Sequence, residues 1–407
     1  MSFNHFLSKR DKNNENPKPY KKDMKIFTSP ITVFDMHRVK LFCGVLCATL
    51  ISTCANPSST GSSVDMRQHS HECKDRNSLQ MVDYFLPMPS GNMQSDVWGA
   101  AGVIPRDVDN GLEGMGQNPD WNYWDGKIIK APKGKYHLFA SRWPGSLTHY
   151  DWSRSVAIHA VSEAPKGPYI IPQQLFSDRN GLGHNITGGV LPDGRYYVVA
   201  SDAGRSGDVF IADTIDGEYI LQGPVAMEAN GQNLEHAGAN VSIIVRPDGK
   251  FLLVSRPGII MLSDDIMGPY VAQGPSVWPT IEGYDNAKAE DPIIWYSGGL
   301  YHITVNWWNI RKARHLVSRD GISNWVDTGI AYDPLLGFEY VDGRKNEWSL
   351  LERPGVLIEN GHVTHFTFSA LDVNKWNDKG NDNHGSKILV VPFDGRCFDA
   401  ALQKALP

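Results

Sequence analysis

The stretch Asp125-Gly-Lys-Ile-Ile, followed by Tyr136-His-Leu-Phe, is the first of five that repeat one pattern. In each, a polar residue precedes an apolar run and a Gly-containing turn, and a second β-rich run begins 10 or 11 positions after the polar residue. The five polar residues lie 60, 55, 51 and 62 positions apart, and they are Asp125, Asn185, Asn240, Asp291 and Arg353. A repeat of roughly 40–60 residues built from short strands predicts an all-β fold, a five-bladed β-propeller with four-stranded antiparallel blades.

A second repeat runs in register with the first. Four segments each follow an apolar strand and end in an aromatic residue: Ser162–Tyr169, Asp213–Tyr219, Ser263–Tyr270 and Ser318–Trp325. Gly, Pro and Asp supply their turn dihedrals, so each is predicted to join the third and fourth strands of a blade. The blades should then run from about residue 118 to about residue 395. An irregular β-sandwich, the alternative fold, would not produce two repeats in register.

The N-terminal region has the pattern of an export signal. Met36-His-Arg-Val-Lys is a short positive region, Leu41–Ile51 is an apolar stretch too short to cross a bilayer, and Leu50-Ile-Ser-Thr-Cys54 is similar to a bacterial lipobox. We therefore expect a signal peptide at 36–54 and a lipid anchor on Cys54, which makes the protein an exported lipoprotein of the periplasm or outer-membrane surface. Residues 1–35 would be a non-native or mis-assigned extension, 55–76 a flexible tether, and 77–407 the propeller domain.

Composition and charge narrow the class of partner. The chain is 41% hydrophobic and 21% charged, with a net charge of -6 and 12 Trp. This balance gives no electrostatic footprint for nucleic acid. Exposed aromatic residues in a polar groove suit sugar rings, although Trp residues also fill the wedges between blades. Two cysteines remain in the mature domain, Cys73 and Cys397, which could form a disulfide that ties its two ends together. Without a CxxC pair, a cysteine-based zinc site is not expected, and no metal ligands are assigned.

The five repeated polar residues should converge on the axis, because each opens the innermost strand of its blade. Three more polar residues flank them, His184, Glu290 and Glu352. So many polar groups at one ring need partners, either one another around a water-filled channel or a bound substrate. Their mixture of acids, amides and a cation favours a substrate pocket.

Asp125 at the first inner strand and the Asp291-Pro-Ile-Ile segment at a later one resemble the five-bladed propeller glycoside hydrolases, which include families 43, 62, 32, 68, 117 and 130. The resemblance covers about residues 118–395. It implies hydrolysis of a glycosidic bond at the axial pocket, with one carboxylate as base or nucleophile, a second orienting the substrate, and a third group as acid. It implies no required cofactor.

The resemblance assigns catalytic carboxylates of the family to Asp125 and Asp291, but it does not identify the residue that acts as the acid. Family 43 has a second Asp on the middle blade and an acid Glu on the fourth, whereas this chain has Asn240 and Asp291 there. Family 117 has a His acid near the last blade, where this chain offers Glu352, Arg353 and, farther along, His365. The candidates for the acid are, in order, Glu290, Glu352, His184 and His302.

Two alternatives stay open. His184, Asn185, Asn240 and Arg256, with His159 and His236 nearby, contain the groups that a uronate lyase needs to neutralise a carboxylate and remove the neighbouring proton. Propeller lyases of this kind are seven-bladed, however. A propeller that binds a glycan without cleaving it is the other alternative.

The remaining candidate residues are aromatic and polar side chains of the pocket wall and two histidines. Trp121, Asn122 and Trp124 form the densest aromatic–polar cluster and are predicted to contact the substrate, as is Trp307 in a rim loop; blade packing is their alternative role. His137 and His302 alternate with apolar neighbours and are interpreted as inter-blade histidines.

The ligand class follows from the cations near the axis. Arg256 and Arg353 suggest an acidic or sulfated plant or algal oligosaccharide, because a guanidinium can hold a carboxylate by two hydrogen bonds. A calcium ion could lie on the axis among Asp291 and the amides. The Gly111–Gly116 stretch is a turn-rich connection and not a phosphate loop, because it lacks the Lys-Ser/Thr ending.

Overall fold

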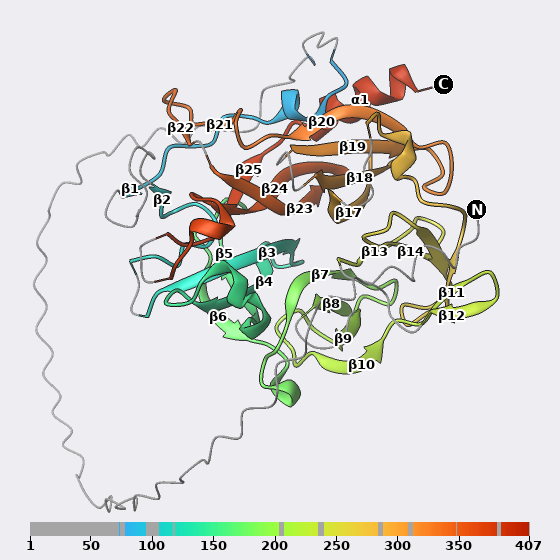
Figure 1. The fold of residues 1–407 in the computed structure, drawn as a ribbon, viewed down its shortest axis with the longest axis horizontal. Helices are drawn as coiled ribbons and strands as arrows, with labels where there is room; N and C mark the ends of the chain where they lie inside the picture. Colours follow the sequence, from blue (N-terminus) through green and yellow to red (C-terminus); the bar gives the residue numbers. More distant parts are fainter. Residues whose placement is uncertain are drawn as a thin grey trace, which may run out of the picture. The chain divides into compact units, whose positions relative to one another are not determined.

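Five β-sheets surround one axis in the computed structural model (Figure 1). The structure describes residues 73, 78–94, 106–116, 119–202, 207–234, 240–283, 288–307, 312–346, 348–380 and 384–406. The prediction of an all-β, five-bladed propeller is confirmed. Within the described residues, no helix has the length and apolar character of a membrane span.

Three blades are simple four-stranded antiparallel sheets, with strands in chain order from the axis outward. Blade 1 contains β3 (Trp121–Lys130), β4 (Tyr136–Pro144), β5 (Val156–Ser162) and β6 (Ile170–Gln174). Blade 2 contains β7 (His184–Val190), β8 (Tyr196–Asp202), β9 (Asp208–Ala212) and β10 (Ile220–Pro224). Blade 4 contains β17 (Ala289–Ser297), β18 (Leu300–Trp307), β19 (Lys312–Ser318) and β20 (Val326–Tyr332).

Blade 3 is extended by a hairpin. Its four strands are β13 (Ser242–Val245), β14 (Phe251–Val254), β15 (Ile260–Ser263) and β16 (Tyr270–Ala272). The hairpin of β11 (Met227–Ala229) and β12 (Gln232–Leu234) adds two strands, with β11 parallel to β16. Two short two-stranded sheets lie outside the blades and pair β1 (Met93–Gln94) with β2 (Arg106–Asp107) and β21 (Phe338–Glu339) with β22 (Lys345–Asn346).

Blade 5 joins the two ends of the propeller. Its sheet contains β23 (Leu350–Glu359), β24 (His362–Leu371) and β25 (Lys387–Pro392). The outer position is taken by an earlier segment, because Leu112 exchanges two backbone hydrogen bonds with Ile388 at 3.0 Å each. The Asn110 amide reinforces this contact through both the N–H and the carbonyl of Val390. A disulfide joins Cys73 to Cys397 on α1 (Gly395–Ala405), so the predicted pairing is confirmed.

The four predicted outer hairpins are confirmed, and their aromatic residues have a common role. In the first three, the terminal Tyr side chain is buried and its hydroxyl donates to a backbone carbonyl four residues earlier, in the pairs Tyr169–Pro165, Tyr219–Ile215 and Tyr270–Ile266. A buried phenol needs such a partner. The second repeat in the sequence therefore reflects a turn closed by its own aromatic side chain.

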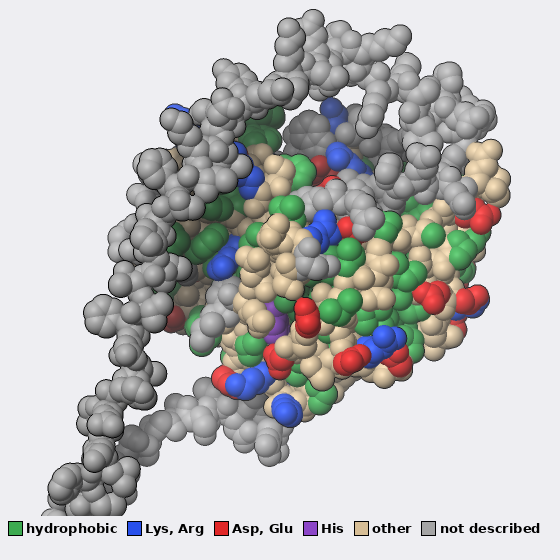
Figure 2. Space-filling model, turned by 90° about the horizontal axis from the view of Figure 1, so that it is seen from below, with side chains coloured by type: hydrophobic (Ala, Val, Ile, Leu, Met, Phe, Trp, Pro, Cys, Tyr) green, Lys and Arg blue, Asp and Glu red, His purple; other side chains and the backbone are tan. Residues whose placement is uncertain are grey.

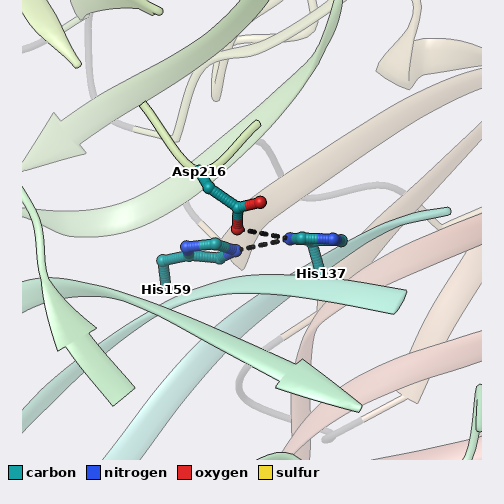
Figure 3. Close-up of side chains that lie close together, drawn as sticks. All are labelled: His137, His159 and Asp216. Carbon is teal, nitrogen blue, oxygen red and sulfur yellow. Dashed lines mark hydrogen bonds and ion pairs between the residues drawn. The ribbon is translucent and has the colours of Figure 1, made fainter. Parts of the chain in front are cut away.

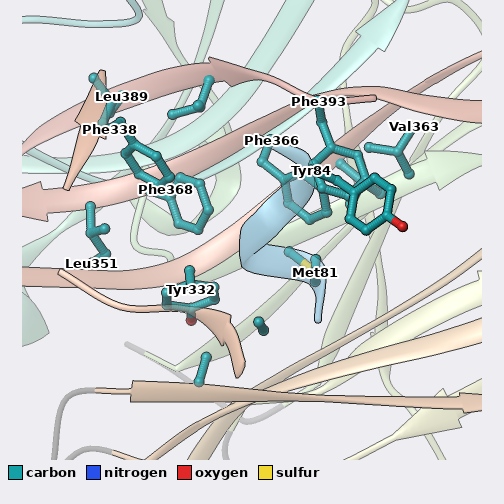
Figure 4. Close-up of a cluster of buried hydrophobic side chains, with 14 of the residues drawn as sticks. Met81, Tyr84, Tyr332, Phe338, Leu351, Val363, Phe366, Phe368, Leu389 and Phe393 are labelled. Atoms are coloured by element: carbon teal, nitrogen blue, oxygen red, sulfur yellow. The ribbon is translucent and has the colours of Figure 1, made fainter. Parts of the chain in front are cut away.

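The largest apolar cluster lies between blades 4 and 5, and the N-terminal segment contributes to it. Met81 and Tyr84 of the short 3-10 helix η2 (Met81–Tyr84) pack beside Phe366, Phe393 and other side chains of blade 5 (Figure 4). Burial of such aromatic side chains is worth roughly 1.5–3 kcal/mol each. The segment before blade 1 is thus part of the propeller core.

Candidate functional site

The five repeated polar residues share an unusual backbone conformation. Asp125, Asn185, Asn240, Asp291 and Arg353 have φ values of 69°, 54°, 58°, 54° and 48°. The antiparallel register shifts at this point in blades 1, 4 and 5. Asn and Asp tolerate the left-handed region better than most residues, whereas Arg does not, so Arg353 is strained. A bulge that re-aims a side chain is common beside active sites.

The inner strands form a narrow axial cavity directly after this ring. All five contribute to its wall, through Lys127, Thr187, Ser242, Ile293 and Val356 among others, and Arg353 lies at it as well. The repeated positions therefore do converge on the axis, as the sequence predicts.

Arg353 connects the two predicted catalytic aspartates. Its Nε lies 3.1 Å from Asp125 Oδ1, and its Nη1 lies 3.5 Å from Asp291 Oδ1. All three side chains are buried, at 1%, 1% and 6% exposure. Arg353 thus holds both carboxylates at the axis.

Asp125 is fixed by further donors. Its Oδ2 accepts hydrogen bonds from Ser141 Oγ at 2.7 Å and from the backbone N–H of Ile186 at 2.9 Å. Its own N–H donates to Ser369 Oγ at 2.7 Å. Blades 1, 2 and 5 therefore all orient this residue, and both of its carboxyl oxygens accept hydrogen bonds.

Three carboxylates gather on the other side of Arg353. Glu290, Asp291 and Glu352 each offer an oxygen within 4.8 Å of the others. Burial, as the largest cause, raises the pKa of Asp291 to about 8, with Arg353 opposing and Glu290 and Glu352 adding to the rise. Burial and Glu352 also raise the pKa of Glu290. Ionisation of all three carboxylates would place like charges next to one another at a high electrostatic cost. The cluster therefore holds a proton near neutral pH.

Two cations border this cluster. Lys375 Nζ lies 2.5 Å from Glu352 Oε2, and Arg256 Nη2 lies 3.3 Å from Glu290 Oε2. The Arg256 side chain is 42% exposed and that of Glu290 is 20% exposed, which makes them the most accessible pair of the group. Lys375 begins the short 3-10 helix η7 (Lys375–Asn377) in the connection between β24 and β25, outside the repeated positions.

Asp202 is an axial carboxylate that the sequence analysis missed. It ends β8, where its carboxylate accepts from Asn185 Nδ2 at 2.5 Å and from the Asn240 backbone N–H. Burial raises its pKa, while Asn185 and Arg353 lower it. Asp202 pairs with His184 across the sheet, so the hairpin register of blade 2 would have placed it beside the ring.

Two polar atoms at the ring have no hydrogen-bond partner among the described residues. Asn240 Oδ1 and Arg353 Nη2 are buried and make no hydrogen bond to a described group. One is an acceptor and the other a donor, so a water molecule or a sugar hydroxyl can satisfy each of them.

His184 lies beside Asp125 but is not suited to act as an acid. Its Nδ1 lies 3.1 Å from Ser155 Oγ and 3.3 Å from Ser141 Oγ, and its ring stacks on Trp152 at 4.9 Å. Burial lowers its pKa to about 4, with Asp125 opposing, so the ring is neutral at pH 7. It can orient Ser141, which in turn binds Asp125.

The predicted aromatic wall is largely packing. Asn122 is 1% exposed and binds the carbonyls of Pro144 and Leu147 and the N–H of Ser386. Trp124 is 2% exposed against Trp143 and His149. The alternative role, blade packing, fits both.

Trp121 and Trp307 are only partly buried. Arg142 lies 4.0 Å over the Trp121 ring. Trp307 ends β18 and pairs with Ala289, next to Glu290, so Trp307 remains a candidate for substrate contact.

His159, His302 and His365 lie away from the ring. His302 bonds His315 at 3.1 Å within blade 4, not between blades, and burial lowers its pKa to about 3. It is therefore not a candidate acid. His365 binds Thr364 on β24, also off the axis. His159 pairs with His137 in blade 1, and His236 lies outside the described residues.

A calcium ion on the axis remains a prediction. The Glu290–Asp291–Glu352 group offers the oxygen ligands that calcium prefers. Lys375 and Arg353 already supply positive charge to the same carboxylates, which lowers their attraction for a cation.

Figure 2 shows one face of the molecule, with both acidic and basic side chains on its described surface. Over its described surface, acidic and basic side chains are interspersed and do not form a patch of one sign.

Comparison with solved structures finds similarity to glycoside hydrolases of the propeller type. A family 117 enzyme from the marine bacterium Zobellia galactanivorans is 15% identical, with a TM-score of 0.46, and the match covers 70% of this chain and 89% of that one. A family 43 enzyme from Xanthomonas citri, complexed with xylotriose, is 10% identical with a TM-score of 0.45 and coverages of 67% and 87%. A family 43 β-xylosidase/α-arabinofuranosidase from a compost metagenome is 12% identical with a TM-score of 0.43 and coverages of 75% and 95%. No family model and no curated protein matches the sequence.

Proposed function

We propose that this protein is a glycoside hydrolase that cleaves an oligo- or polysaccharide in the axial pocket of the propeller. The observation that carries the proposal is the arrangement around Arg353, with Asp125 on one side and the Glu290–Asp291–Glu352 carboxylate group on the other. Glycosidic cleavage needs one ionised carboxylate and one group that gives a proton to the leaving oxygen.

Asp125 is the proposed base or nucleophile. Its carboxylate is held by Arg353, Ser141 and the Ile186 N–H, which fixes its orientation before substrate arrives. A preorganised group of this kind does not have to reorient during the reaction.

Glu290 is the proposed acid. Its pKa is raised, and it is the only member of the carboxylate group whose side chain is one-fifth exposed, against 5% for Glu352 and 6% for Asp291. An acid must reach the leaving oxygen, which favours the accessible carboxylate. Asp291 and Glu352 then keep a proton available by mutual repulsion with Glu290.

The substrate proposed is a plant or algal saccharide with an acidic or sulfated group. Arg256 supports this choice because it is exposed and adjacent to Glu290. Delivery to such a substrate outside the cell follows from the proposed lipid anchor at Cys54.

A screen of acidic and neutral plant and algal oligosaccharides tests the proposal, with reducing ends and near-ultraviolet absorbance both measured. We expect new reducing ends without absorbance, and none from Glu290→Gln. Absorbance would identify elimination by a lyase, because elimination leaves a conjugated double bond. Glycan binding without either product would identify a recognition propeller.

A further inference from the structure

A second polar cluster lies away from the axis, between blades 1 and 2. His137 on β4 and His159 on β5 point their rings toward each other, with Nδ1 of His137 2.8 Å from Nε2 of His159. Asp216, from the turn between β9 and β10, places Oδ1 3.4 Å from the same His137 nitrogen. Figure 3 shows the carboxylate directed at the gap between the two rings.

The two histidines are held in place before any ligand arrives. They are 3% and 4% exposed, on neighbouring antiparallel strands. The His159 ring is nearly parallel to both neighbours; it lies edge to edge with the His137 ring and against Phe139, at centroid distances of 5.0 and 4.8 Å. Packing therefore brings the two ring nitrogens together before any ligand is bound.

Asp216, unlike the two buried histidines, is exposed to solvent. Its side chain is 71% exposed, and it comes from the neighbouring blade. The cluster is thus closed by apolar and aromatic packing on one side and open to solvent on the other. Lys135, whose charge acts on His137, is paired with Glu163 at 2.7 Å.

We propose that His137, His159 and Asp216 bind one divalent transition metal of the zinc class, which links blade 1 to blade 2. One nitrogen from each imidazole and a carboxylate oxygen, all within 4.8 Å of one another, form the donor set that zinc accepts. Solvent would supply the fourth ligand on the Asp216 side.

The geometry requires a small adjustment. In the metal-free arrangement, one ring nitrogen donates to the other. Zinc–nitrogen bonds of about 2.0–2.1 Å in a tetrahedral site place two nitrogens about 3.3 Å apart, so the rings must separate slightly as the metal replaces the shared proton. A shift of the His137 ring supplies this separation, and rotation of the exposed Asp216 side chain brings its carboxylate oxygen toward the metal.

Zinc titration of the chelator-treated, tag-free protein tests the proposal. The zinc content is measured by inductively coupled plasma mass spectrometry after gel filtration. Cobalt(II) is used in place of zinc, because its visible absorption spectrum reports the coordination number. We expect one equivalent of zinc, a visible cobalt spectrum typical of four ligands, and a higher Tm with zinc. Asp216→Asn should weaken binding at least tenfold without disturbing the fold, since its side chain is exposed.

Control variants identify the site. Asp264→Asn changes an exposed aspartate in the equivalent turn of blade 3 and should bind zinc as the unmodified protein does. Glu290→Gln should also keep zinc, which separates this site from the axial carboxylates. His137→Gln and His159→Gln should abolish binding. Failure to bind zinc or cobalt at micromolar concentrations, or binding unchanged in Asp216→Asn and both histidine variants, would overturn the proposal.

Discussion

Arg353 and Asp125 form a buried ion pair across the join between the last blade and the first, with Nε and Oδ1 3.1 Å apart and both side chains 1% exposed. A pair this deep is weak evidence for added stability, because both charges are desolvated. Its importance lies in its geometry. One guanidinium fixes two carboxylates that would otherwise repel each other at the axis.

Removal of the Arg353 guanidinium should therefore lower the stability of the fold. Arg353→Met leaves Asp125 buried without its countercharge, and the expected loss of unfolding free energy is about 3–5 kcal/mol. Urea denaturation measures it. The double variant Arg353→Met/Asp125→Asn should lose clearly less than the sum of the single changes. Additive losses would mean that the two side chains do not interact. Arg256→Met, which removes an exposed guanidinium, is the matched control.

Stability should fall as pH rises through the neutral range. Burial raises the pKa of Asp291 to about 8, above the ordinary carboxyl value of about 4. Between these values the folded protein keeps a proton that the unfolded chain has lost, so this contribution is complete below pH 4 and disappears as pH passes 8. Asp291→Asn should flatten the change in Tm between pH 5 and pH 8.5, whereas Asp264→Asn should leave it unaltered. An equal slope in Asp291→Asn would contradict the assignment.

Substitution of His184 distinguishes glycoside hydrolysis from elimination by a lyase. In the hydrolase it orients Ser141 beside Asp125, so His184→Ala should lower kcat by about tenfold, or ~1.4 kcal/mol. The basic and acidic limbs of the pH–rate profile should not move, since the ring is neutral above a pKa of about 4. A loss as large as that of an axial aspartate would instead favour proton removal by His184 in a lyase.

Export is tested by labelling. Cells fed a palmitate analogue should label the protein, and Cys54→Ser should remove the label. Cys73→Ser is the control, because Cys73 is bonded to Cys397 in the propeller. Label that persists in Cys54→Ser would leave a secreted protein without a lipid anchor at this position.

The sequence predicts the fold well because each blade repeats its own turn chemistry. The left-handed residue in or just before each inner strand and the Tyr that closes the outer hairpins of blades 1 to 3 are both visible as spaced residue types. The convergence of Asp125, Asp291 and Arg353 followed from that register alone.

Two features of the site were not predictable in this way. Asp202 and Lys375 reach the axis from a second strand and from a long connection, outside the repeated position. Trp124 and Asn122 were interpreted as pocket wall, but both faces of β3 are buried, so residue type does not reveal which face meets the substrate.

The most direct test of the account is the activity of Asp125→Asn on the first saccharide that the protein cleaves, compared with Asp208→Asn. Asp208 is equally buried at 1% but lies on β9, away from the axis. The amide keeps the shape of the carboxylate and cannot accept a proton. The account predicts that kcat/KM falls at least 10³-fold, roughly 4 kcal/mol, in Asp125→Asn with an unchanged circular dichroism spectrum, and stays within a few-fold in Asp208→Asn. Cleavage by Asp125→Asn at a rate similar to that of the unmodified protein would contradict it.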